Sequence, residues 1–539
     1  MTGKERIQKA FKLQKTDTVP WVPFVGVHGG SLIGVSAKEY LCSSDHIVDG
    51  ITKAVDQYDP DGIPVMFDLQ LEAELLGCKL NWSEQNPPAV ISHPLNEGKS
   101  IDDLVIPNIT DGRIPVAMEA TKRLREKYPE LALYGLITGP FTLALHLLGT
   151  DIFTKLFEDP EYIERLFTFC TRVAKRMVDF YAESGCDVIA VVDPMTSQID
   201  PGTFEMSVSP LMTELFDYIR KKDVLSSFFV CGHAQQNIEV MCKCKPDNIS
   251  IDENIPLDFV KETAFKHKIS FGGNLQLTVV LLMGTQEEVK FNTLDCLDLG
   301  GELGFILSPG CDLPMATPPE NLMAVTKMAR DPYEREVVRA MTRQNQGLKL
   351  LNMKDYGQSD KVIVDIITLD SESCAPCQYM VEAVKKIAPY FEGIVEWREH
   401  AIKQMSGVTF MASLMVKNIP TICIDGKISF VSQIPPKNDL VAAIQKRINE
   451  KLRLKIQAKN GEFIVVGKNE EEIKELKSRI KTAFLQTGMI IDVKFITGEN
   501  MISEYGLNAS PAIILRTNSV KSQGKIPSVD VIIEWLKEV

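Results

Sequence analysis

Two sets of cysteines in this sequence have spacings that could support chemistry. Cys374 and Cys377 form a Cys-X-X-Cys pair in "SESCAPCQYM", the spacing of dithiols that undergo thiol–disulfide exchange. Cys231 and His233 stand two residues apart in "FFVCGHA", and Cys311 follows in "SPGCDLP". Thiolates and imidazoles are the usual ligands of zinc. The first set therefore predicts a redox dithiol, and the second raises the question of a metal site.

Each set also has a purely structural interpretation. Free cysteines pack well in protein cores, so Cys231 and Cys311 could simply fill space, and His233 could be an ordinary loop histidine. Cys374 and Cys377 could be an inert remnant. Their position between a strand and the start of a helix favours chemistry, because a helix N-terminus stabilises a thiolate at the first cysteine.

The elements that position the second set are strands of an α/β domain. Between residues 19 and 310, short apolar runs alternate with amphipathic helical patterns, which indicates parallel βαβ units. We expect strands at residues 19–27, 62–67, 131–139, 187–193, 226–231, 248–252, 269–274 and 302–310. Eight such units predict a TIM-type (β/α)8 barrel, whose functional groups lie at the carboxyl ends of its strands. Those ends carry Gly139, Asp193, Cys231, His233, Asp252, Glu253, Asn274 and Cys311.

The first set belongs to a different kind of domain. A strand, the Cys-X-X-Cys helix and a later strand led by Pro420 form a thioredoxin-like arrangement. The pattern then recurs with Pro511 in the place of Pro420, but Gly467, Lys468 and Asn469 stand where the cysteine pair would be. We therefore predict a barrel over residues 1–345, a linker over 346–360, a thioredoxin-like domain over 361–452 and a second one without the cysteine pair over 453–539.

Composition narrows the class of partner and the compartment. The net charge is -13 with a pI of about 5.3, which argues against a nucleic-acid partner because phosphate binding needs a basic surface. No apolar run is long enough to span a membrane, and the first residues do not read as a signal peptide. Twelve scattered cysteines are then expected to be reduced thiols, ligands or redox pairs. We predict a cytoplasmic protein with no membrane partner.

The first part of the chain resembles the superfamily of uroporphyrinogen decarboxylase and the cobalamin-dependent methyltransferases. The resemblance covers the whole predicted barrel, through "ITGPFTLALHLLG", "FEDPEYIERLF", "ESGCDVIAVVDP", "VCGHAQQNIEVM", "FGGNLQ" and "ILSPGCDLPMATPPENL". Decarboxylases of this superfamily bind a polyanionic porphyrinogen through arginines near the N-terminus, and "WVPFVGVHGGSLIG" contains none. The resemblance therefore implies the methyltransferase branch.

That branch holds zinc through a His-X-Cys pair and a distant cysteine in a "PGC" motif. Cys231 and Cys311 match the two cysteines, whereas the histidine position is occupied by Phe229. The resemblance thus implies zinc on Cys231 and Cys311, with His233 as the nearest replacement ligand and Asp252, Glu253 and Asp312 as further oxygen donors. It also implies that Asp193 faces the pocket as a catalytic residue.

The predicted function is cobalamin-dependent methyl transfer between a corrinoid and a thiol or other small nucleophile, with a fused redox module that uses Cys374 and Cys377. No Asp-X-His-X-X-Gly motif occurs, so a separate corrinoid protein is expected to supply the cobalamin. A small methyl donor or thiol acceptor and a thioredoxin reductase-type electron donor are the other expected partners. The alternative is a thiol–disulfide oxidoreductase whose barrel binds a redox substrate or partner.

Overall fold

The computed structural model describes residues 1–341, 350–354, 356–359, 361–372, 374–459, 462–488, 491–515 and 519–537. The chain divides into two compact units, Met1–Leu440 and Val441–Val539. The predicted linker lies partly outside the described residues, and the bounds of the four predicted segments remain predictions. No helix in the described part of the chain is both long enough and apolar enough to cross a membrane.

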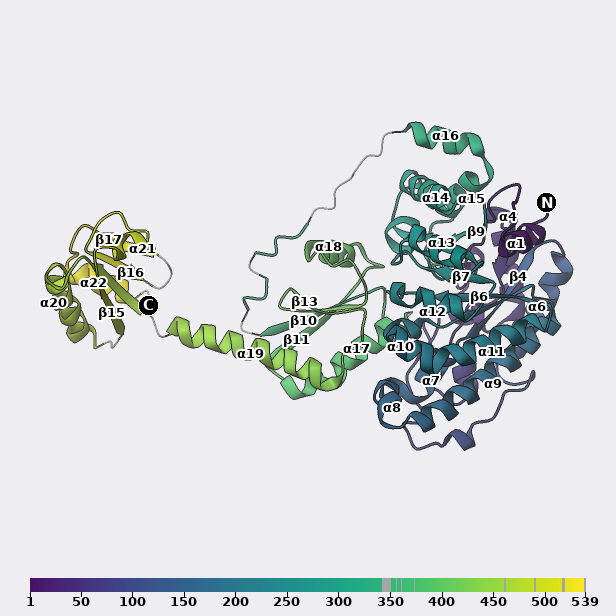
Figure 1. Ribbon diagram of the computed structural model, residues 1–539, viewed down its shortest axis with the longest axis horizontal. Helices are drawn as coiled ribbons and strands as arrows, with labels where there is room; N and C mark the ends of the chain where they lie inside the picture. The colour runs from purple at the N-terminus through teal and green to yellow at the C-terminus, as the bar shows by residue number, and fades with distance from the viewer. Residues whose placement is uncertain are drawn as a thin grey trace. The chain divides into compact units, whose positions relative to one another are not determined.

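The larger unit is built on a seven-stranded sheet in the order β1-β4-β5-β6-β7-β8-β9. Every neighbouring pair is parallel, and helices cover the outside of the curled sheet (Figure 1). The strands are β1 (Gly62–Pro64), β4 (Ala132–Thr138), β5 (Val188–Val192), β6 (Leu225–Val230), β7 (Asn248–Ile251), β8 (Ser270–Leu275) and β9 (Phe305–Pro309). The α/β class is confirmed, and the sheet is consistent with a TIM-type barrel.

The first predicted strand, at residues 19–27, is not a regular strand. Trp21 forms a single parallel bridge with Leu307 of β9, and on its other side its carbonyl accepts from the backbone N–H of Asp61, next to β1, at 2.8 Å. Pro20 and Pro23 remove two of the N–H groups that a longer ladder would need. The segment therefore links the two edges of the sheet without becoming an eighth strand.

The helices follow the strands as a βαβ pattern requires. The main helices are α1 (Gly3–Phe11), α4 (Ser44–Tyr58), α6 (Ile114–Lys127), α7 (Pro140–Leu148), α8 (Ile152–Glu158), α9 (Pro160–Ser184), α11 (Ser209–Arg220), α12 (Ile238–Lys243), α13 (Leu257–Lys266), α14 (Gln286–Gly300), α15 (Pro319–Arg330) and α16 (Pro332–Ala340). A small antiparallel sheet of β2 (Leu80–Asn81) and β3 (Ala89–Val90) is inserted between β1 and β4.

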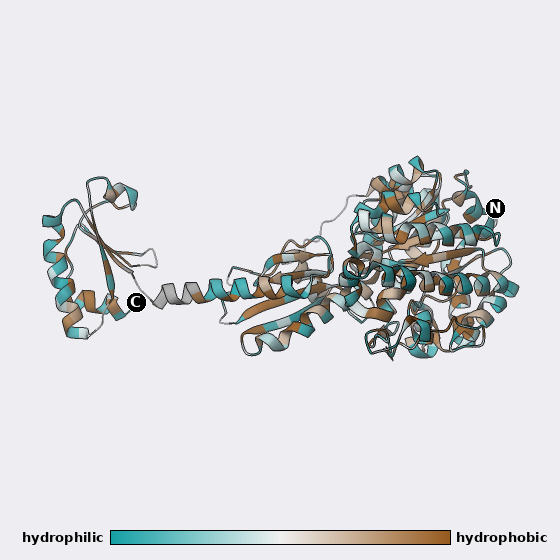
Figure 2. Ribbon diagram, turned by 60° about the horizontal axis from the view of Figure 1, so that its bottom comes forward, coloured by the Kyte–Doolittle hydropathy of each residue, from teal (hydrophilic) through white to brown (hydrophobic). Residues whose placement is uncertain are grey.

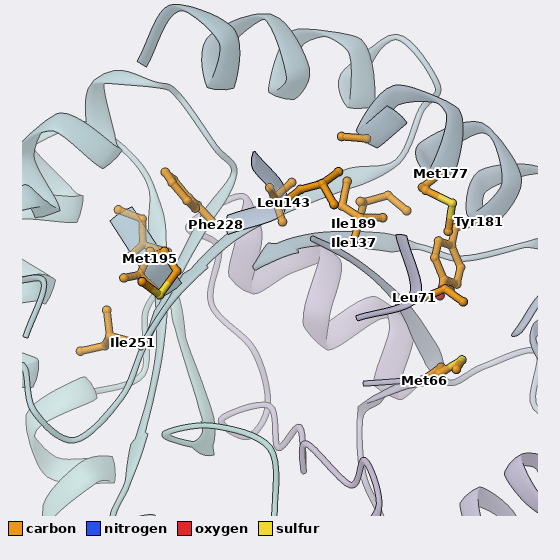
Figure 3. Close-up of a cluster of buried hydrophobic side chains, with 14 of the residues drawn as sticks. Met66, Leu71, Ile137, Leu143, Met177, Tyr181, Ile189, Met195, Phe228 and Ile251 are labelled. Carbon is orange, nitrogen blue, oxygen red and sulfur yellow. The ribbon is translucent and has the colours of Figure 1, made fainter. Parts of the chain in front are cut away.

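Helix α9 shows how local signals set these elements. The helix ends at Gly185, which adopts φ 102° at the C-cap, a left-handed conformation that favours glycine. Its buried face packs Met177 and Tyr181 toward Ile137 of β4 and Ile189 of β5 (Figure 3). Figure 2 shows the same division, with hydrophobic strands inside and hydrophilic faces on the outer helices. Apolar burial of this kind holds the strand ends in register.

Residues 362–434, which we call the CXXC module, form a second sheet in the same unit. Its strands β10 (Val362–Thr368), β11 (Val395–Ala401), β12 (Thr421–Ile424) and β13 (Lys427–Val431) lie in the order β11-β10-β12-β13. Strands β10 and β11 are parallel, and the other pairs are antiparallel. Helix α17 (Ala375–Ile387) follows β10, and α18 (Met405–Ser413) follows β11. The peptide bond before Pro420 is cis.

The smaller unit repeats this topology. Its strands β14 (Glu462–Gly467), β15 (Asp492–Thr497), β16 (Ala512–Leu515) and β17 (Ser519–Gln523) lie in the order β15-β14-β16-β17, with the same directions of pairing. Its helices are α20 (Glu470–Thr487), α21 (Met501–Glu504) and α22 (Val529–Lys537), while α19 (Lys437–Lys459) precedes the sheet. A cis bond again precedes the matching proline, Pro511. The assignment of both sheets as thioredoxin-like remains a prediction.

Candidate functional site

One cavity at the carboxyl ends of the barrel strands contains both sets of cysteines. Its volume is about 890 Å³, counted with its opening to solvent. The barrel contributes Phe67, Leu69, Gln70, Pro87, Val192, Pro194, Cys231, Gly232, Asp252, Glu253, Asn254, Leu277, Cys311 and Asp312. The CXXC module contributes Leu369, Cys374, Ala375, Pro376, Cys377, Ile419 and Pro420. The cavity therefore combines the barrel mouth with the end of α17.

Cys231 and Cys311 lie side by side in this cavity. Cys231 follows β6 and Cys311 follows β9, and their Sγ atoms are 3.2 Å apart. Both side chains are half-buried free thiols. The hydrogen bond with Cys311, together with burial, raises the pKa of Cys231 well above its usual value. The two predicted residues are thus brought together as a thiol pair.

Two carboxylates stand beside this pair, after β7. Asp252 Oδ2 accepts from the backbone N–H of Gly232 at 2.5 Å and from Asn254 Nδ2 at 2.8 Å. Glu253 Oε1 accepts from the backbone N–H of Leu277 at 3.0 Å. Burial raises the pKa of Asp252 to about 6, and burial followed by the charge of Asp252 raises that of Glu253 to about 8. A carboxyl group with a pKa near neutrality can accept and release protons in this cavity.

The third predicted metal ligand does not join the cysteine pair. His233 is not among the residues that line the cavity. Asp312 does line it, but burial raises the pKa of its carboxyl well above the usual value. Within the described ranges, no group of three or more His, Cys, Asp and Glu side chains is arranged to hold a metal ion.

Phe229 accounts for the lack of a third metal-binding side chain beside Cys231 and Cys311 in the described part of the chain. Residues two apart on a strand face the same side, so Phe229 projects into the barrel on the same side as Cys231. Its ring packs against Phe24, with centroids 5.2 Å apart, and against Phe67 at 6.0 Å. An apolar cluster therefore occupies the position at which the resemblance implies a histidine.

Asp193 is fully buried and holds the start of α7. Its carboxylate accepts from the backbone N–H of Phe141 at 3.1 Å, the N–H of Thr142 at 2.8 Å and the Thr142 hydroxyl at 2.6 Å. Burial raises its pKa to about 6. Its neighbours Val192 and Pro194 line the cavity, but Asp193 does not. This placement favours a positioning role for Asp193, because the start of α7 donates hydrogen bonds to both of its carboxylate oxygens. Two other residues expected at the strand ends, Gly139 and Asn274, also lie outside the cavity lining.

The Cys-X-X-Cys pair opens helix α17. Cys374 is the N-cap residue, and Cys377 is completely buried with its Sγ accepting from the backbone N–H of Leu369 at 3.3 Å. The sequence favours a thiolate at Cys374, but its hydrogen bond with Cys377 and its burial raise the pKa of this thiol well above the usual value. Cys374 is the half-buried and therefore more accessible member of the pair.

Tyr379 anchors the CXXC module on the barrel. Its side chain is 0% exposed and belongs to the barrel's main hydrophobic cluster. Its hydroxyl lies 3.0 Å from Nδ1 of His146 on α7, and burial lowers the pKa of His146 to about 3, so the imidazole is neutral. Further polar contacts are Gln378 Nε2 to the Val90 carbonyl at 2.5 Å, Lys403 Nζ to Asn86 Oδ1 at 2.9 Å, Gln198 Nε2 to the Ser432 carbonyl at 2.9 Å and the Ile434 N–H to Gln198 Oε1 at 3.0 Å.

Sequence reasoning missed this interface. An aromatic residue two positions after a Cys-X-X-Cys pair reads as part of the module's own core, and nothing local pairs Tyr379 with His146, which lies 233 residues away. Gln198 and Gln378 are equally ordinary polar residues in the sequence. Only the tertiary arrangement identifies them as docking residues.

Comparisons with known proteins show which family the barrel belongs to. The uroporphyrinogen decarboxylase (URO-D) family model matches residues 2–332. Methylcobamide:CoM methyltransferase MtbA of Methanosarcina acetivorans is 29% identical over 346 residues, which covers 61% of this chain and 98% of that protein. The corresponding MtaA of Methanosarcina barkeri is 27% identical over 290 residues, or 52% of this chain and 83% of its own.

A solved structure agrees in fold. A methyltransferase from Methanosarcina mazei superimposes with a TM-score of 0.58 at 23% identity, covering 62% of this chain and 99% of its own. The predicted resemblance of the barrel is therefore confirmed over nearly its whole length. The chain belongs to the uroporphyrinogen decarboxylase (URO-D) family, and its relatives include corrinoid methyltransferases.

Proposed function

We propose that this protein transfers a methyl group between a corrinoid, carried by a separate protein, and a small thiol. The observation that carries the proposal is the cavity at the barrel mouth, where Cys231 and Cys311 stand beside Asp252 and Glu253. Similarity to methylcobamide:CoM methyltransferases over 98% of the length of one of them supports the reaction class. Coenzyme M is accordingly the first acceptor to test.

The barrel side of the cavity suits a corrinoid once the CXXC module has moved off the mouth. Apart from the carboxylates, its lining is largely apolar or sulfur-bearing, with Phe67, Leu69 and Pro87 among the barrel residues, and such surfaces bind bulky ligands by excluding water. When bound, a methylated corrinoid supplies an electrophilic methyl group. The residues of this chain then have two tasks: to hold the acceptor sulfur at the mouth and to remove its proton.

Glu253 is the group proposed to take that proton. A thiolate is a far better nucleophile than a thiol, and a carboxylate with a pKa of about 8 is a better proton acceptor than an ordinary glutamate. The Leu277 N–H fixes one oxygen of Glu253, while the other lies against Gly310, which precedes Cys311; an added Cβ at Gly310 would come within 2.2 Å of it. Glycine at 310 therefore leaves room for the carboxylate beside the cysteine.

The residues present do not fit the predicted zinc site. A catalytic zinc ion takes three protein ligands and leaves one position open. Asp252 and Glu253 lie in the same cavity as Cys231 and Cys311, but among the described residues no three such side chains are arranged to hold a metal ion. The proposed chemistry therefore uses no zinc ion, and His233 remains a predicted ligand. The proposed chemistry depends on the reduced thiols, the carboxylates and the apolar wall.

The test is an anaerobic assay of the reduced full-length protein with methylcobalamin and a panel of small thiols that includes coenzyme M. We expect loss of the methylcobalamin absorbance and formation of the S-methyl product. The exposed Cys42, which lies outside the cavity, provides the control variant Cys42→Ser, which should match the parent. Absence of methyl transfer to every thiol, with protein shown to be folded and reduced, would refute the proposal and favour the oxidoreductase alternative.

A further inference from the structure

We propose that the CXXC module is an intramolecular reductase of the barrel site: Cys374 and Cys377 reduce a disulfide formed between Cys231 and Cys311. This activity is separate from methyl transfer and does not depend on it. The observation behind it is that one cavity holds all four thiols.

The barrel pair is suited to reversible oxidation. The two Sγ atoms, 3.2 Å apart, need approach by only about 1.2 Å to reach the S–S bond length of about 2.05 Å. Metal binding would protect two such thiols, but no third donor joins them among the described side chains. A two-electron oxidant such as a peroxide can therefore convert the pair into a disulfide and disable the mouth of the barrel.

The module places its dithiol at this pair. Cys374 lines the same cavity as Cys231 and Cys311. Cys374 is half-buried, whereas Cys377 is fully buried behind it. The more accessible thiol is the one able to attack, and the buried thiol is the one placed to resolve the product.

The exchange balances in two steps. Cys374 gives up its proton and attacks one sulfur of the Cys231–Cys311 disulfide as a thiolate. A mixed disulfide forms, and the other barrel sulfur leaves as a thiolate that takes up a proton. The Cys377 thiolate then attacks Cys374, which releases the second barrel thiol. Two electrons and two protons pass from the module to the barrel. An external dithiol then reduces the Cys374–Cys377 disulfide.

Docking through Tyr379 is expected to make this thiol–disulfide exchange fast. Its buried side chain and its hydrogen bond with His146 hold α17 over the mouth. Attack within one chain depends on the effective concentration of the tethered thiol and not on the concentration of the protein. The rate of exchange should therefore be independent of protein concentration.

The decisive experiment traps the mixed disulfide in the full chain. Cys377→Ser removes the resolving thiol, so the protein is oxidised with hydrogen peroxide under anaerobic conditions, alkylated, digested without reductant and examined by mass spectrometry. We expect a cross-link between the peptide carrying Cys374 and the peptide carrying Cys231 or Cys311, in a monomeric fraction. Cys42→Ser added to this background is the matched control and should leave the cross-link unchanged, whereas Cys374→Ser should abolish it.

A second variant tests the docking. Tyr379→Ala in the Cys377→Ser background should lower the yield of the cross-link by at least about tenfold, because the module stays tethered but no longer holds Cys374 at the barrel mouth. The inference is overturned if a Cys231–Cys311 disulfide forms and Cys374 never joins it, or if the cross-link appears only between separate chains. Both readouts concern the oxidation state of named cysteines, so they hold whether or not methyl transfer is found.

Discussion

The surroundings of Glu253 bring the pKa of its carboxyl group close to neutral pH. Burial and the neighbouring Asp252 raise its pKa to about 8, and a general base works only when ionised. The rate of methyl transfer to a thiol should therefore rise with pH through about 8. Glu253→Gln should lower kcat/KM at pH 8 by about 10²-fold and leave only the dependence due to the ionisation of the acceptor thiol.

The pH profile separates this role from a structural one. Glu262, an exposed glutamate on α13 paired with Lys266 at 3.0 Å, supplies the control Glu262→Gln, which should keep the parent's profile. If Glu253→Gln lowers the rate equally at every pH, Glu253 is not the base.

Asp193 is expected to affect stability rather than chemistry. It accepts three hydrogen bonds from the start of α7, so Asp193→Ala removes a cap and leaves buried donors without partners. The cost is about 3 kcal/mol, which should appear as a lower midpoint of thermal unfolding. Asp193→Asn keeps one acceptor oxygen and should lie between the parent and the alanine variant. An asparagine variant with the parent's thermal midpoint but no activity would instead make Asp193 catalytic.

The alternation of side chains along strand β6 determines which residue lies next to Cys231 in the site. Phe229 and Cys231 face the same side of the strand, and the phenylalanine fills the position of a metal-binding imidazole. Phe229→His should therefore complete a set of three donors with Cys231 and Cys311 and raise bound zinc to about one ion per chain. Metal analysis of protein purified anaerobically measures this change.

The unaltered protein provides the comparison for the metal content. It should hold well below one zinc per chain, because two thiols alone are an incomplete set. Phe228→His is the matched control, since Phe228 is buried on the opposite face of β6, next to Phe216 on α11, and it should gain no zinc. Stoichiometric zinc in the parent that is lost in Cys231→Ser would contradict this reading.

The elements were predictable where their signals are local. Seven strands follow from apolar runs, and the stop of α9 follows from Gly185, because burial and glycine conformation act over a few residues. The segment at residues 19–27 has the apolar composition of a strand, but its prolines prevent the ladder. Cys231 and Cys311 could be paired from the resemblance, whereas the role of Asp193 could not, since its partners Phe141 and Thr142 lie on another element.

At the scale of the larger unit, the CXXC module forms part of the wall at the opening that the proposed methyl donor would have to reach. The same docked arrangement that brings Cys374 to the barrel cysteines puts Cys374, Pro376 and Pro420 in the wall of the cavity. Reduction of the site and delivery of a methyl group therefore require different arrangements of the module. Release of the module should increase access to the barrel mouth.

Tyr379 is the residue through which this prediction can be tested. Tyr379→Ala removes a fully buried anchor and its hydrogen bond with His146. Docking by one buried aromatic anchor contributes about 2 kcal/mol or more. The variant should therefore speed the alkylation of Cys231 and Cys311 by a bulky maleimide by about tenfold or more. Tyr390→Ala is the matched control, because Tyr390 belongs to the same module but is 67% exposed. Labelling is followed peptide by peptide in reduced protein. Equal rates in the parent and in Tyr379→Ala would mean that the docked module does not limit access, and methyl delivery would then need no movement of the module.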